Sequence, residues 1–112
     1  MVKIEANKLI VDFHEWAWSL RTQGFPVYAV TKNGEKILIG GTVKKRTVYD
    51  LPPDTIAVLR RYYSNAGYLT VFVYLLDDDE IHEIILNEQN NFEGIESLPE
   101  LVKEAIKELW VG

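Results

Sequence analysis

Residues 68–76 constrain the fold of this chain more than any other segment. Their sequence, YLTVFVYLL, is apolar at almost every position. Alternate side chains of an extended strand point to opposite faces, so Leu69, Val71 and Val73 would share one face and Phe72 and Tyr74 the other. A strand that is apolar on both faces is typical of a sheet that is covered on both sides. We therefore expect this segment to be a central strand.

Apolar residues at helical spacing predict three helices, at residues 7–20, 54–64 and 97–110. The pair Pro52-Pro53 precedes the second helix, because proline fits the first turn of a helix. Ser97 and Glu100 have the spacing of a capping box at the start of the third helix.

Four further segments are strand-like, at residues 27–31, 36–39, 42–49 and 81–86. Asn33-Gly34 separates the first two and is a strong hairpin signal. The predicted order is therefore α-β-β-β-α-β-β-α, which indicates an α+β fold with a single mixed β-sheet covered by helices. At 112 residues, the chain is expected to form one domain spanning residues 1–112.

The composition is that of a globular protein, with 47% hydrophobic and 26% charged residues. No apolar run approaches the roughly 20 residues of a membrane span, and no apolar run of signal-peptide type is present. We therefore expect a cytoplasmic protein without a membrane partner. Cysteine is absent, which excludes disulfides and thiol catalysis.

Charge is distributed unevenly along the chain. Residues 1–76 contain 10 lysines and arginines against 6 acids, a net charge of +4, whereas residues 77–112 contain 2 against 11, a net charge of -9. Such polarity is expected either of solvated faces or of surfaces that meet partners of opposite charge.

The basic part of the chain includes a candidate surface for nucleic acid. Five side chains within a short stretch would contact phosphates if they shared a face: Lys44, Lys45, Arg46, Arg60 and Arg61. The alternative is that these residues solubilise the chain or pair with its own acids.

A second candidate surface lies on the predicted first helix. Val11 and Trp18 are seven residues apart and would lie together on the side opposite the core stripe. An exposed tryptophan commonly anchors a protein interface, which predicts a homodimer through this face. The alternative is that another layer of the same domain covers them.

Motifs for the common cofactors and metals are missing from the chain. It has no glycine-rich phosphate loop, no HExxH, no GxSxG and only two histidines. We therefore expect no cofactor, no metal site and no catalytic residues.

The segment TVKKRTVYDLPPDTIAVLRRYYSNAGYLTVFVYL, with the element order before it, resembles the core of restriction-endonuclease-like nucleases, which include archaeal Holliday-junction resolvases. The resemblance covers residues 7–76. It implies a metal-dependent phosphodiesterase whose hairpin supplies an aspartate and then a glutamate-x-lysine triplet. Lys44 matches the lysine, but Thr42 replaces the glutamate, and the hairpin has Glu35 and no aspartate. The resemblance therefore implies a degenerate relative that does not cut.

These observations favour a noncatalytic binding or assembly protein, with a second copy or another protein as its partner. Two alternatives stay open. One is a degenerate nuclease-like protein that binds nucleic acid. The other is an active metal-dependent nuclease, with carboxylates drawn from Glu15, Glu35 and Asp50.

Overall fold

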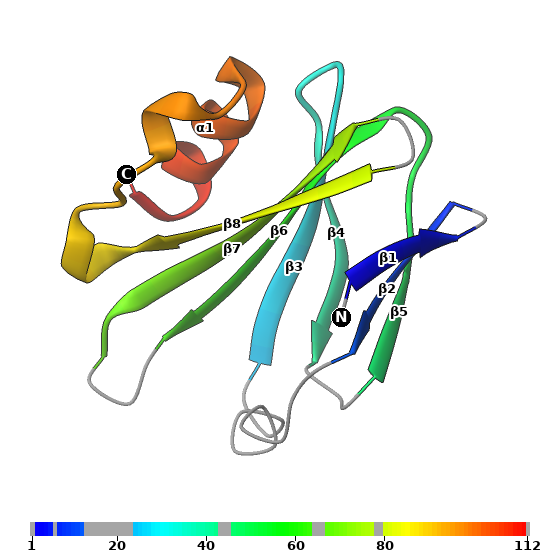
Figure 1. Ribbon diagram of the computed structural model, residues 1–112, viewed down its shortest axis with the longest axis horizontal. Coiled ribbons are helices and arrows are strands. Elements are labelled where there is room, and N and C mark those ends of the chain that lie inside the picture. The colour runs from blue at the N-terminus through cyan, green and yellow to red at the C-terminus, as the bar shows by residue number, and fades with distance from the viewer. Residues whose placement is uncertain are drawn as a thin grey trace.

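The computed structural model describes residues 2–5, 7–12, 24–42, 46–63, 67–77 and 80–111. These residues form eight strands, one α-helix and several short helical turns (Figure 1). The strands are β1 (Val2–Glu5), β2 (Lys8–Asp12), β3 (Gly24–Thr31), β4 (Lys36–Thr42), β5 (Arg46–Asp50), β6 (Thr55–Tyr63), β7 (Leu69–Asp77) and β8 (Glu80–Asn87). The helical segments are η2 (Glu88–Asn90), η3 (Ile95–Ser97), α1 (Glu100–Ile106) and η4 (Lys107–Val111).

The strands form two antiparallel sheets. The large sheet has five strands in the order β4-β3-β6-β7-β8, and the small sheet has three in the order β1-β2-β5. The predicted fold class, an α+β single mixed β-sheet covered by helices, is therefore wrong. The described part of the chain is mostly strands and contains one α-helix.

Two predicted helices account for this error. Lys8–Asp12, the start of the first, is strand β2, and the rest of that helix lies outside the described residues. Thr55–Tyr63, which covers most of the second, is strand β6. A strand buried on both faces has apolar residues at nearly every position, so some of them fall at helical spacing by coincidence.

The prediction for residues 68–76 is confirmed in its main point. β7 lies between β6 and β8 and is buried on both faces from Leu69 to Tyr74. It is one strand away from the edge of the sheet, and β6 takes the middle position. The Asn33-Gly34 hairpin is also present, joining β3 to β4 with Gly34 at φ 83°.

The large sheet is the middle of three layers (Figure 1). One face packs against α1 through a core of buried residues: Val30, Ala57, Leu59, Leu69, Val71, Val73, Leu86, Leu98, Val102, Ala105 and Ile106. The other face packs against the small sheet through a second core: Leu9, Val27, Tyr49, Val58, Phe72 and Tyr74. Because successive side chains of β6 and β7 point to opposite faces of the large sheet, each of these strands contributes residues to both cores.

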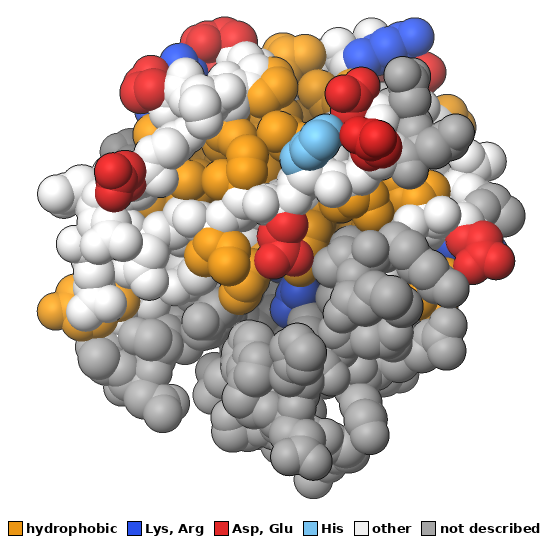
Figure 2. All heavy atoms as spheres, viewed as in Figure 1, with side chains coloured by type: hydrophobic (Ala, Val, Ile, Leu, Met, Phe, Trp, Pro, Cys, Tyr) orange, Lys and Arg blue, Asp and Glu red, His pale blue; other side chains and the backbone are white. Residues whose placement is uncertain are grey.

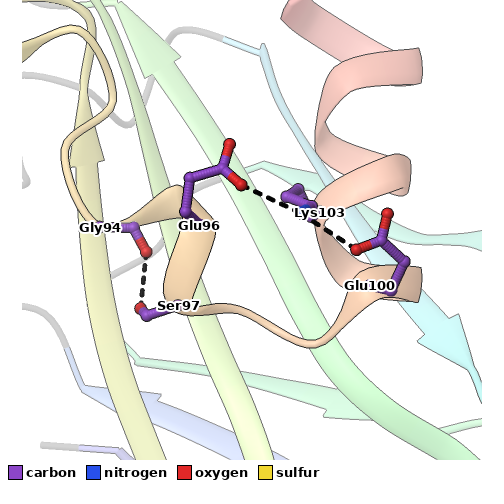
Figure 3. A network of polar contacts seen from close by, with 5 residues as sticks. All are labelled: Gly94, Glu96, Ser97, Glu100 and Lys103. Carbon is purple, nitrogen blue, oxygen red and sulfur yellow. Dashed lines mark hydrogen bonds and ion pairs between the residues drawn. The ribbon is translucent and has the colours of Figure 1, made fainter.

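The last helix is confirmed, but its predicted capping box is not formed. α1 begins after Pro99, and the Ser97 hydroxyl donates to the carbonyl oxygen of Gly94, 2.7 Å away. Figure 3 shows the Lys103 ammonium between two carboxylates, 3.1 Å from Glu96 and 3.0 Å from Glu100. This cation ties the η3 turn to the first turn of α1.

Among the described residues, no helix is both long enough and apolar enough to cross a membrane.

Candidate functional site

Of the five predicted nucleic-acid contacts, only Arg60 and Arg61 have described side chains, and these two do not share a face. Lys44 and Lys45 lie outside the described residues, and only the backbone of Arg46 is described, at the start of β5. Arg60 and Arg61 are consecutive on β6, so their side chains point to opposite faces of the large sheet.

Arg60 is a buried residue between the two sheets. Its side chain is only 6% exposed, and Nη1 donates to the Tyr74 hydroxyl at 2.7 Å. The guanidinium carbon lies 5.2 Å from the centre of the Phe72 ring, which is the geometry of a cation–π contact. Burial raises the pKa of Tyr74 above its usual 10.0, although the Arg60 charge and hydrogen bond act in the opposite direction. In this position Arg60 stabilises the core and presents little surface to a phosphate.

The predicted interface residues are not tested by the structure. Val11 belongs to strand β2 and not to a helix, and its side chain is not described. Trp18 lies outside the described residues. Residues 8–12 therefore do not form the helical face on which this interface was predicted.

The two described acids considered for nuclease chemistry lie in different elements. Glu35 is exposed in the β3–β4 hairpin, and Asp50 ends β5 in an ion pair with Lys8. Glu15 lies outside the described residues. In the part of the chain that the structure describes, no three histidine or acidic side chains are grouped so that they could hold a metal ion.

The two edges of the large sheet differ in how they are protected. β8 carries the exposed charged or titratable side chains Glu80, His82 and Glu83. His82 Nε2 lies 3.8 Å from the Glu80 carboxylate and 4.0 Å from that of Asp77. Figure 2 shows a histidine side chain beside acidic side chains on this face of the molecule. Charges on an edge strand discourage pairing with another strand.

β4, at the opposite edge, has few such charges. Within Lys36–Thr42 the only charged residue is Lys36, at the first position, and its ammonium is 2.9 Å from the carboxylate of Glu108. Among the described strands, β4 pairs with β3 alone. A largely apolar edge with one charge, at its first position, can accept a further strand.

One exposed and two half-buried apolar side chains accompany this edge. Leu38 is 60% exposed although it lies in the middle of β4, and it stands opposite Tyr28 of β3. The Tyr28 ring meets the Trp110 ring edge to face, with centroids 5.8 Å apart. We call Leu38, Tyr28 and Trp110, together with the edge of β4, the β4 surface.

The sequence contained a partial signal for the β4 surface. It shows the uncharged run after Lys36, but it does not show that this strand ends its sheet. Edge position depends on the pairing of β3 with β6, which are separated by more than twenty residues.

The comparisons with known proteins found nothing similar: no family model matches the chain, and no curated protein and no solved structure matches it. The resemblance to restriction-endonuclease-like nucleases therefore stays an untested prediction.

Proposed function

We propose that this protein is a noncatalytic assembly module that forms a homodimer through the β4 surface. The observation that carries the proposal is the exposure of Leu38, 60%, on an edge strand that has one charged residue. A large apolar side chain exposed on an edge with so little charge favours the addition of another strand to the sheet.

A second copy of the chain satisfies the geometry of this edge. Two antiparallel β4 strands related by a twofold axis at Leu38 place the two leucines opposite each other. Counted along the strand without the irregularity between Leu38 and Gly40, the same register sets Lys36 of one copy opposite Gly40 of the other, so no like charges meet across the pair. The two large sheets then become one continuous sheet.

The aromatic pair supports the same arrangement. Leu38 and Tyr28 are cross-strand partners, so their side chains share one face of the sheet, and Tyr28 contacts Trp110 on that face. The twofold axis brings these apolar groups of both copies onto the same side of the joined sheet. Aromatic residues commonly supply much of the binding energy of an interface.

Light scattering and sedimentation of purified protein test the proposal. The native chain should be a dimer at micromolar concentration. Leu38→Lys should be a monomer, because the substitution places two lysines opposite each other at the centre of the interface. Ile85→Lys is the matched control, since Ile85 is 54% exposed on β8, the other edge strand. It should leave the dimer unchanged.

Two results would overturn the proposal. The first is a native chain that is monomeric throughout the concentration series. The second is a dimer that survives Leu38→Lys, and if Ile85→Lys dissociates that dimer, the interface lies along β8 instead.

A further inference from the structure

A pocket opens at one end of the two sheets. Its volume is about 350 Å³, which is within the usual range for sites of small molecules. It lies where the β1–β2 turn, the β5–β6 connection and the end of β7 meet. Its lining residues are Ile4, Asn7, Leu51, Pro52, Pro53, Asp54, Thr55 and Leu76.

Backbone hydrogen bonds hold the pocket wall in place. The carbonyl oxygen of Asn7 accepts from the Leu51 N–H at 3.0 Å, and that of Asp54 accepts from the Lys32 N–H at 2.9 Å. The Thr55 hydroxyl donates to the carbonyl oxygen of Pro52 at 2.7 Å. The wall is therefore formed before a ligand arrives, which lowers the entropic cost of binding.

Two residues of the wall have an unusual backbone conformation. Asn7 and Asp54 are left-handed, with φ 63° and 64°. Asparagine and aspartate tolerate this region better than other residues with side chains, so both positions suit the tight turns that form the wall. Among the described residues, no hydrogen bond engages the Asn7 side chain, so its amide is available to a ligand.

The charge in the lining is negative. Among the described lining residues, Asp54 is the only charged one, and none is a lysine or arginine. Its Oδ1 is 3.3 Å from the ammonium of Lys32, which is 63% exposed. An exposed ion pair of this kind contributes little, so a ligand cation can share or replace it.

We infer that this pocket binds a small amphipathic amine. The protonated ammonium group donates to the Asp54 carboxylate and to the Asn7 side-chain oxygen. The apolar body of the ligand packs against Ile4, Leu51 and Leu76. The negative lining disfavours a carboxylate of the same shape.

Titration of the labelled protein with phenethylamine, followed by NMR, tests this inference. Saturable shifts are expected at the backbone amides of Asn7, Asp54 and Thr55. Phenethyl alcohol and phenylacetate have similar apolar bodies without the positive charge, and they should bind at least roughly tenfold more weakly, because charge-assisted hydrogen bonds are the stronger kind.

Variants of Asp54 and Lys32 test whether the pocket recognises the positive charge of the amine or only its apolar body. Asp54→Asn keeps a residue that tolerates the left-handed region and should weaken amine binding by roughly tenfold or more. Lys32→Met removes the competing ammonium and should tighten binding. Asp50→Asn is the control, because Asp50 pairs with Lys8 and does not line the pocket.

Three results would overturn the inference. They are equal binding of the alcohol and the amine, unchanged amine binding by Asp54→Asn, and no shift at the lining residues up to millimolar phenethylamine. Loss of binding in Asp50→Asn would also contradict it, because amine binding would then depend on the overall charge of the surface and not on the Asp54 carboxylate.

Discussion

Nη1 of Arg60 donates a hydrogen bond of 2.7 Å to the hydroxyl of Tyr74, and both side chains are buried between the two sheets. Removing one partner of a buried pair leaves the other polar group poorly solvated, whereas removing both leaves an apolar contact. Tyr74→Phe and Arg60→Met should each lower the free energy of unfolding by about 1–3 kcal/mol. The double variant should lose less than the sum of the two, as measured by urea unfolding. Strictly additive losses would show that the two groups are not coupled.

The same tyrosine should make stability fall at high pH. Burial holds the folded-state pKa of Tyr74 above 10.0, the value expected in the unfolded chain. The folded state therefore keeps the phenol proton more tightly, and this stability is fully present below pH 10.0 and lost as pH rises through the folded pKa. Unfolding free energies measured from neutral pH into the alkaline range should decline more steeply for the native chain than for Tyr74→Phe. Identical slopes would contradict the assignment.

Gly40 of β4 is required by its closeness to Tyr49. A Cβ atom at Gly40 would lie 2.6 Å from Cε1 of the Tyr49 ring, and that ring is only 3% exposed and cannot swing into solvent. Gly40→Ala should therefore destabilise the protein by about 1–3 kcal/mol through overpacking. Adding Tyr49→Leu to Gly40→Ala should cost less than Tyr49→Leu costs in the native background. A Gly40→Ala variant as stable as the native chain would refute the clash.

The ion pairs of Lys103 with Glu96 and Glu100 should contribute to stability only above acidic pH. The hydrogen bond from Lys103 lowers the pKa of Glu96 below 4.5, and hydrogen bonds to Glu100 and Glu96 raise the pKa of Lys103. A lowered carboxyl pKa gives stability that is present above 4.5 and is lost as pH falls through the folded pKa. The difference in thermal midpoint between the native chain and Lys103→Met should therefore shrink as pH is lowered. A constant difference down to low pH would count against these ion pairs.

The elements that could be predicted from the sequence are those with an unambiguous local signal. Asn33-Gly34 predicted the β3–β4 hairpin because the turn needs a residue with positive φ, and Gly34 has φ 83°. The apolar stripe of residues 97–110 predicted the last helix, because its exposed face is polar.

β6 could not be predicted in the same way. Ala57 and Leu59 enter one core and Val58 the other, so neither face shows a polar alternation. The signal that distinguishes such a strand from a helix is its pairing with β3 and β7, which is a property of the whole sheet.

The candidate sites depend on long-range geometry, which the sequence does not show. Arg60 is basic and was therefore expected on a surface, yet its partners Phe72 and Tyr74 on the next strand place it inside. Likewise, Leu38 has an ordinary apolar sequence context, and only the strand order shows that it is exposed at an edge.

The path of the chain between β4 and β6 determines how the layers can separate. After β4 the chain crosses to the small sheet as β5 and returns to the large sheet as β6, so a covalent crossing between the sheets lies at each end of β5. On the other side, β1 lies against β8 with no direct chain connection between them. Thermal breathing of the two sheets should therefore begin at β1 and β8, and amide hydrogens there should exchange before those of β5.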